Sequence, residues 1–248
     1  MKLMTHVVVG YPSLAATEHI VRIMDSLNVS YIELQIPFSD PLADGPTIMK
    51  ACEESLAHGT RVSDAFVLAK KLSKEVKAKL LFMAYFNTVF TYGVEQFCKD
   101  AKATGITGLI VPDMPIEEEG NEHFSKNCER YGLDNIRVLS PVSTKQRIQK
   151  NAKVGTGFVY CTARQGITGV GKTLDPKVID YLKLVKKEFS LPLAVGFGIS
   201  KKEHIDVLKG VADIAVVGSA LIDVINRSNK ETTEKNVKAF IEKLDVVN

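Results

Sequence analysis

The sequence has no block of basic residues interleaved with aromatic ones, and its 32 lysines and arginines nearly balance 29 aspartates and glutamates. A net charge of +3 argues against nucleic acid as a partner. The apolar stretch at the N-terminus is broken by Thr5 and His6, whereas a membrane span needs roughly 20 apolar residues. This stretch is not typical of a signal peptide either. We therefore expect a cytoplasmic protein without a membrane segment.

Clustered metal ligands are also lacking. The four cysteines lie far apart, with no Cys-x-x-Cys pair, and the five histidines are equally scattered. Reduced thiols and the absence of a metal site are the expectation. No linker, repeat or low-complexity segment divides the chain, so residues 1–248 are expected to form a single domain.

What the sequence does contain is an alternation of predicted strands and helices from end to end. The predicted strands are Leu3–Val9, Tyr31–Gln35, Leu80–Ala84, Gly108–Val111, Ile136–Leu139, Gly157–Cys161, Leu193–Val195 and Ile214–Val217. The predicted helices include Leu14–Leu27, Val94–Ala103, Glu117–Tyr131, Pro176–Glu188, Lys201–Leu208 and Glu231–Leu244. Eight such units, without a Gly-x-Gly-x-x-Gly motif after the first strand, favour a single closed (β/α)8 barrel over an open doubly wound sheet.

The second predicted strand carries a carboxylate on its inward face. Ile32, Leu34 and Ile36 share the face that packs on helices, so Glu33 and Gln35 point into the barrel. A buried carboxylate is costly unless it is paired or its shifted pKa is used, which makes Glu33 a candidate acid–base residue. The alternative is a structural ion pair with an inward lysine or arginine, for which no other strand offers an obvious candidate.

A proline-stiffened loop, Pro37–Pro46, follows this strand and carries Asp40 and Asp44. In a (β/α)8 barrel the loops on this side of the strands build the active site, so Asp44 is the second candidate for acid–base chemistry. The competing interpretation is that Asp44 caps the helix that begins near Pro46, and capping does not exclude catalysis.

Glycines follow the last three predicted strands. They lie in Arg164–Gly169, in Gly196–Gly198 and in Gly218-Ser219, which opens a short predicted helix, Ala220–Ile225. Unobstructed backbone N–H groups at a helix N-terminus bind anions, and the loops after strands seven and eight are the usual phosphate site of a barrel. Glycines also serve simply as turns, but three sets in order favour a phosphate site.

The fourteen residues from Glu33 to Pro46 resemble the signature of the tryptophan synthase α subunit family. The resemblance continues, in order, through Tyr85-Phe86-Asn87, Val111-Pro112-Asp113-Met114-Pro115, Tyr160, Arg164–Gly169, Val195–Ser200 and Gly218-Ser219. It implies a TIM barrel that needs no cofactor and that splits indole-3-glycerol phosphate into indole and glyceraldehyde 3-phosphate in tryptophan biosynthesis. It also implies an α2β2 complex in which indole passes to a β subunit, and only that subunit carries pyridoxal phosphate.

The same resemblance implies roles for single residues. Glu33 would protonate the indole C3 and help to take the proton from the glycerol hydroxyl, and Asp44 would hold the ring N–H and stabilise the developing positive charge. The residues implied in binding the substrate or its phosphate are Tyr160, Thr168, Gly169, Phe197, Gly198, Gly218 and Ser219. Arg164–Thr173 would be a lid in which Thr168 bonds Asp44 on closure. The residues implied to face the β subunit are Asp40, Pro41, Asn87 and Asp113.

The chain departs from the family pattern at several positions. Gln35 stands where the family usually has glycine, and a glutamine there would crowd the substrate or hydrogen-bond the neighbouring carboxylate. His6 replaces a usually apolar residue of the indole pocket, and the alternative is that it is simply a histidine of the core. Met49 replaces a common glutamine. The N-terminal helix that plugs the barrel floor in many members is expected to be absent.

These departures leave two further functions open. One is a binding subunit that activates β while Gln35 weakens its own catalysis. The other is a different phosphate-binding barrel, which the fourteen-residue loop disfavours.

Overall fold

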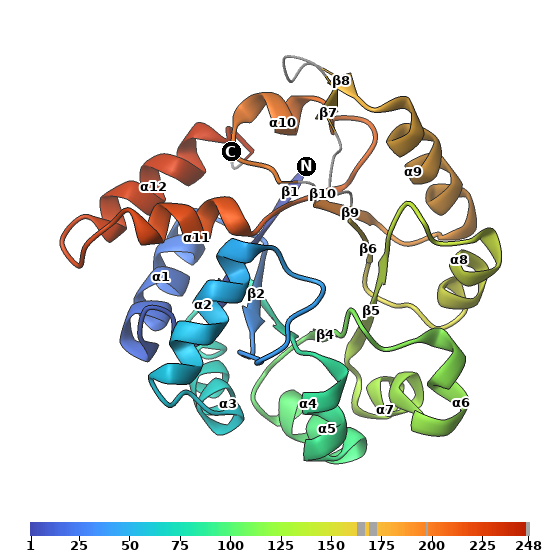
Figure 1. Cartoon of the computed structure of the whole chain (residues 1–248), viewed down its shortest axis with the longest axis horizontal. Helices are drawn as coiled ribbons and strands as arrows, with labels where there is room; N and C mark the ends of the chain where they lie inside the picture. The colour runs from blue at the N-terminus through green and yellow to red at the C-terminus, as the bar shows by residue number, and fades with distance from the viewer. Residues whose placement is uncertain (163–166, 169–172, 197, 247–248) are drawn as a thin grey trace.

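The structure is a computed structural model that describes residues 1–162, 167–168, 173–196 and 198–246. Eight parallel strands form a closed barrel in the order β1-β10-β9-β6-β5-β4-β3-β2, with helices arranged around it (Figure 1). The barrel strands are β1 (Lys2–Val8), β2 (Tyr31–Gln35), β3 (Lys79–Met83), β4 (Gly108–Ile110), β5 (Asp134–Leu139), β6 (Val159–Thr162), β9 (Leu193–Gly196) and β10 (Ile214–Val217). The predicted (β/α)8 barrel is confirmed.

The helices follow the strands on the outside of the barrel. They are α1 (Leu14–Ser26), α2 (Pro46–Ala57), α3 (Val62–Leu72), α4 (Phe86–Tyr92), α5 (Val94–Ala103), η1 (Ile116–Glu118), α6 (Glu119–Glu122), α7 (Phe124–Tyr131), α8 (Lys145–Ala152), α9 (Pro176–Glu188), α10 (Lys202–Asp206), α11 (Ser219–Asn226) and α12 (Thr233–Lys243). None of the helices in the described ranges is long and apolar enough to cross a membrane.

One predicted helix is wrong in its continuity. Glu117–Tyr131 is divided into η1, α6 and α7, because His123 between α6 and α7 adopts a left-handed conformation with φ of 53°. An L-residue in that conformation cannot continue a right-handed helix. The bounds of the other predicted strands and helices agree with the structure to within two residues.

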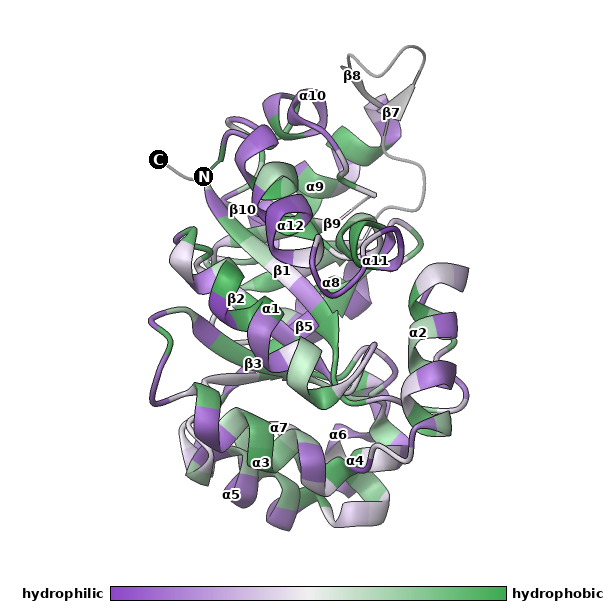
Figure 2. Cartoon of the chain, turned by 90° about the vertical axis from the view of Figure 1, so that its left-hand side faces the viewer, coloured by the Kyte–Doolittle hydropathy of each residue, from purple (hydrophilic) through white to green (hydrophobic). Residues whose placement is uncertain are grey.

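Two layers of apolar side chains hold the barrel together. The outward residues of β2, Ile32 and Leu34, belong to the larger cluster between strands and helices, and the inner cluster includes Met4, Leu81 and Phe158. Figure 2 shows hydrophobic and hydrophilic residues mixed along the surrounding helices, as amphipathic helices require. The two-residue period of a strand therefore decides which side chains enter the barrel.

A short antiparallel hairpin stands apart from the barrel sheet. It pairs β7 (Ile167–Thr168) with β8 (Thr173–Leu174), and Thr168 lies opposite Thr173. The hairpin leads directly into α9 (Figure 1). Of the predicted lid, Arg164–Thr173, the structure describes only Ile167, Thr168 and Thr173, and of Thr168 it describes only the backbone.

Candidate active site

Glu33 lies inside the barrel, as its place in the strand predicts, and is only 3 % exposed. It faces His6, since the two residues are register partners on β2 and β1. The distance from His6 Nδ1 to Glu33 Oε1 is 3.4 Å. An ion pair was the structural alternative for Glu33, but the partner is a histidine rather than the lysine or arginine considered from the sequence.

The pairing changes the acid–base behaviour of His6. Burial by itself would lower the pKa of the His6 imidazole, because it disfavours the charged form. The negative charge and hydrogen bonding of Glu33, supported by Asp44 and Gln35, outweigh burial and raise the His6 pKa above its ordinary value. His6 therefore favours the imidazolium form at a pH where an exposed histidine is already neutral.

Asp44 is held at the rim by two donors to the same oxygen. Gln35 Nε2 donates to Asp44 Oδ2 at 2.7 Å, and the Tyr85 hydroxyl donates to it at 2.8 Å. Burial raises the pKa of Asp44, although His6, Gln35 and Tyr85 all favour its charged form. Helix α2 has Gly45 at its N-cap, without a side-chain capping bond. Asp44 is therefore free of the capping role that was the alternative interpretation.

Gln35 occupies the inward face but bonds a different carboxylate from the one expected. The sequence suggested a bond to its strand neighbour Glu33, whereas the amide reaches Asp44. The reason is that Gln35 lies two residues nearer the mouth, where the loop after β2 returns over the barrel.

Tyr85, which belongs to the segment that resembles the family but has no predicted role, also contacts Asp44 in the candidate site. Its ring stacks on Phe38 at 5.3 Å, and its hydroxyl accepts from the Ala43 backbone N–H at 3.0 Å while donating to Asp44. Burial and the charge of Asp44 raise the pKa of this hydroxyl, so it stays a donor. Its position directly after β3, on the same rim as Asp44, is the signal that could have identified it.

Tyr160 enters the barrel from β6 on the far side. Burial, followed by the charges of Glu33 and Asp44, raises its pKa well above the ordinary value. Both carboxylates therefore act on Tyr160 across the barrel.

The backbone at the predicted anion site begins a helix. Gly218 is the N-cap of α11 and has no side-chain capping bond, and Ser219 is the first helical residue. Gly198 has a φ of +78°, which favours glycine. A Cβ added at Gly218 would lie 3.8 Å from the His6 Cβ, so this helix N-terminus adjoins the His6–Glu33 pair. Gly169 and Phe197, predicted to bind substrate, lie outside the described residues.

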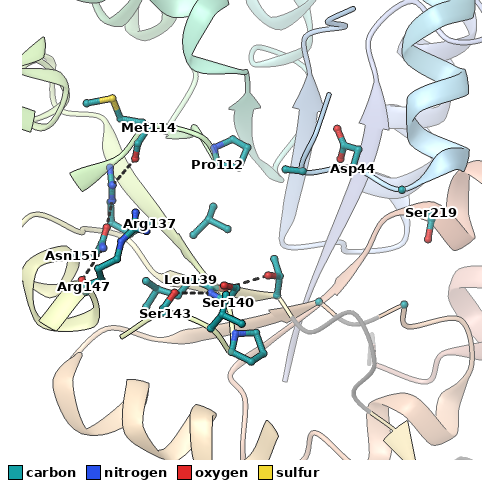
Figure 3. Close-up of a pocket in the computed structure, with 18 of the residues that line it drawn as sticks. Asp44, Pro112, Met114, Arg137, Leu139, Ser140, Ser143, Arg147, Asn151 and Ser219 are labelled. Atoms are coloured by element: carbon teal, nitrogen blue, oxygen red, sulfur yellow. Dashed lines mark hydrogen bonds between the residues drawn. The ribbon is translucent and has the colours of Figure 1, made fainter. Parts of the chain in front are cut away.

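A cavity of about 1000 Å³ opens at the carboxyl ends of the strands. Asp44 and Ser219 line one side, and Arg137 and Arg147 line the other (Figure 3). Glu33, by contrast, is not among the lining residues and is nearly inaccessible.

Arg137 is a buried cation that was not predicted from the sequence. Its Nε donates to Asn151 Oδ1 at 2.7 Å and one of its terminal nitrogens donates to the Met114 carbonyl at 3.0 Å. Burial lowers its pKa. Arg137 lies between the inward residues Ile136 and Val138, so it faces away from Glu33 and ties β5 to α8. An outward-facing arginine on a strand gives no signal of burial in the sequence alone.

The residues expected to face a partner are mostly exposed. Asp40, Asn87 and Asp113 are exposed, whereas Pro41 is buried. Asp113 also accepts a hydrogen bond from the backbone N–H of Phe86 at 2.7 Å, which caps α4. Within the described ranges no three His, Cys, Asp or Glu side chains are grouped to hold a metal ion.

One carboxylate inside the barrel, a second at the carboxyl-terminal rim and a glycine-lined helix N-terminus on the same rim are the arrangement of an enzyme of the (β/α)8-barrel class. The family model for the tryptophan synthase alpha chain matches residues 1–247. The chain belongs to the tryptophan synthase alpha chain family.

Individual relatives agree with this assignment. The tryptophan synthase alpha chain of Desulfotalea psychrophila is 46% identical over 98% of this chain and 93% of its own length. The tryptophan synthase alpha chain of Syntrophotalea carbinolica is 41% identical over 96% of this chain and 93% of its own length. A solved tryptophan synthase α2β2 complex from Pyrococcus furiosus contains a chain with a TM-score of 0.90 and 31% identity, covering 98% of this chain and 97% of that one. A tryptophan synthase structure from M. tuberculosis matches with a TM-score of 0.88 and 28% identity, covering 100% and 93%.

Proposed function

We propose that this chain is an α subunit that cleaves indole-3-glycerol phosphate to indole and glyceraldehyde 3-phosphate. The observation that carries the proposal is the placement of Glu33 and Asp44 at one end of the barrel, beside the N-terminus of α11. Glu33 Oε2 is buried and lacks a partner among the described residues, so one carboxylate oxygen remains for a substrate. Anion binding by the backbone of Gly218 and Ser219 would hold the phosphate.

The chemistry follows from these positions. Glu33, as an acid, places a proton on the indole C3, which turns the ring into a leaving group. As the carbon–carbon bond breaks, its electrons return to the ring, and Glu33 Oε2 takes the proton of the glycerol hydroxyl, whose carbon becomes the aldehyde. Asp44 accepts from the ring N–H and stabilises the positive charge on the protonated ring. No cofactor takes part in these steps.

Assembly belongs to the same proposal. The solved relatives include an α2β2 complex, and this chain would form such a complex with a β subunit that carries pyridoxal phosphate. Asp40, Asn87 and Asp113, exposed around the mouth, would contact that partner, and Pro41 would support the loop from within.

Replacing Glu33 with glutamine tests the catalytic assignment. The amide keeps the size of the side chain but cannot carry the proton, so we expect kcat for cleavage to fall by about a hundredfold or more, measured with the β subunit present. The control is Glu53→Gln, which removes an exposed carboxylate from α2 and should leave the rate unchanged. A Glu33→Gln rate equal to that of the wild type would refute the role of Glu33.

A second function has support of its own. Glu33 does not line the cavity, and the fully buried Gln35 is bonded to Asp44 on the same side of the barrel. These facts favour a binding subunit that activates β while its own cleavage is slow. Gln35→Gly separates the two functions in a steady-state cleavage assay. A much faster variant supports the binding subunit, whereas an equal or slower one supports the lyase, because Asp44 then loses its donor.

A further inference from the structure

Two polar side chains that the proposed chemistry does not use, His6 and Gln35, lie between its two carboxylates. His6 Nδ1 is 3.4 Å from Glu33 Oε1, and Gln35 Nε2 is 2.7 Å from Asp44 Oδ2. His6, Glu33 and Gln35 are all buried. The four side chains therefore form a series, Glu33–His6–Gln35–Asp44, that runs from the barrel interior to the rim.

The acceptors on either side of His6 favour its doubly protonated form. An ionised Asp44 only accepts hydrogen bonds, so the Gln35 amide nitrogen must face it and the acceptor Oε1 is left over. Glu33 on the other side of His6 is also an acceptor. A neutral imidazole has one N–H, whereas an imidazolium has two and can meet an acceptor on each side.

The contact between His6 and Gln35 is looser than the other two. Gln35 favours the charged form of His6, yet His6 Nε2 and Gln35 Oε1 both lack a hydrogen-bond partner of good geometry among the described residues. The electrostatic effect of Gln35 on His6 thus acts at longer range than a formed hydrogen bond.

We propose that His6 is a positioning residue that works as an imidazolium. It holds Glu33 through Oε1, both when Oε2 is ionised and when Oε2 carries the proton for the indole C3, and it balances the charge of Asp44. With Oε1 engaged, Glu33 Oε2 is the oxygen that meets the substrate. The inference rests on the proposed lyase function for its catalytic meaning, but the charge state of His6 is a property of the free protein.

The other groups around His6 are compatible with a positive charge. Glu33 and Gln35 approach from β2 and Asp44 from the loop after β2, and Tyr160 on β6 is near the same two carboxylates. On β10, the second neighbour of β1, the residues paired with Met4 and Thr5 are Val216 and Val217, and Gly218 lies beside His6. No lysine or arginine is among the groups that act on His6 in the described chain.

A titration of the His6 ring nitrogens by NMR tests the charge state directly. The probe is ¹⁵N-labelled full-length protein without ligand, with His6 assigned through His6→Phe. We expect His6 to titrate above about 6.5 in the wild type and to drop by roughly one unit or more in Glu33→Gln, because an opposite charge next to a histidine is lost. The exposed His19, which lies next to Glu234 and not Glu33, provides the internal reference signal. A His6 that titrates below 6.5, or that ignores Glu33→Gln, overturns the proposal.

Kinetics of the α2β2 complex test the positioning role. The wild-type kcat should decline as pH rises through the His6 titration, since the imidazolium is lost. His6→Phe should lower kcat by about tenfold, with KM changing less than about twofold. The decline of kcat with rising pH (the alkaline limb of the pH profile) should be absent in this variant. His6→Gln keeps an N–H donor without a charge, so part of kcat should return while the limb stays absent. A limb that persists in His6→Phe contradicts the role.

The NMR titration and the kinetics together distinguish a failure of this inference from a failure of the proposed lyase function. If the wild-type complex cleaves no indole-3-glycerol phosphate, the proposed lyase fails, while the NMR titration still decides whether His6 is an imidazolium. If the complex is active and Glu33→Gln is inactive, but His6 does not respond to Glu33, the lyase stands and the inference fails.

Discussion

At the scale of single residues, Asp44 lies in the candidate active site, and its buried charge lowers the free energy of unfolding. Its Oδ2 already accepts from Gln35 and Tyr85, but burial still raises its pKa on balance. A carboxyl group whose pKa is higher in the folded than in the unfolded state costs nothing below its unfolded pKa. The cost appears as pH rises, and it is complete above the folded pKa. The free protein is therefore less stable at neutral pH than it would be with a neutral side chain at this site.

Asp44→Asn should stabilise the free chain and impair cleavage. The amide oxygen can still accept from Gln35 and Tyr85, while the buried charge disappears, so we expect a gain of about 0.5–2 kcal/mol in the free energy of unfolding at pH 7. Urea denaturation at several pH values measures the gain, which should shrink as pH falls towards 3.8, the ordinary value for Asp. A gain independent of pH would show that Asp44 carries no such cost.

At the scale of elements, β2 shows what a pattern in the sequence can and cannot predict. Its two-residue period correctly placed Glu33 and Gln35 inside the barrel. Their partners depend on other things: the His6 contact depends on the register between β1 and β2, and the Asp44 contact on the path of a loop. Neither register nor loop path is encoded in the periodicity of one segment. The break at His123 was missed because neither a glycine nor a proline stands at it, so the sequence gives no local signal that the helix ends there.

The turn between β1 and α1 offers an element-scale prediction. Gly10 has a φ of +82°, and a Cβ there would lie 2.1 Å from Thr60 Oγ1 and 2.6 Å from Ser55 Oγ. Gly210 has a similar φ of +81°, but a Cβ there would meet nothing within 4 Å. We expect Gly210→Ala to cost about 1 kcal/mol from backbone strain alone. Gly10→Ala should cost roughly 2–4 kcal/mol, because overpacking is added.

Chemical denaturation of both variants measures the difference between them. Equal costs would mean that the loop before Thr60 moves away freely, so the turn would not be locked against the α2–α3 connection.

At the scale of the whole molecule, the barrel was predictable because many weak signals agree along the chain. Eight strand–helix units fit one closed architecture. The resemblance of the segment Glu33–Pro46 to a family signature identified the family to which the chain belongs. The shape of the mouth was not predictable, because it depends on several loops that meet only in the folded state. Leu42, on one of these loops, is 82 % exposed, and Phe90 on α4 and Val142 after β5 are exposed as well.

Exposed apolar side chains around the mouth predict where the β subunit docks. Large apolar residues in water are a recurring feature of protein-binding surfaces. We expect Leu42→Asp to weaken binding to the β subunit by about tenfold or more, measured by isothermal titration calorimetry, because a charge would enter a desolvated contact. Val67→Asp is the matched control, since Val67 is 70 % exposed on α3, away from the carboxyl-terminal rim. Equal affinities for the two variants would place the β subunit elsewhere on the barrel. A loss confined to Leu42→Asp, with its unfolding free energy unchanged, would assign the contact to the loop that also carries Asp44.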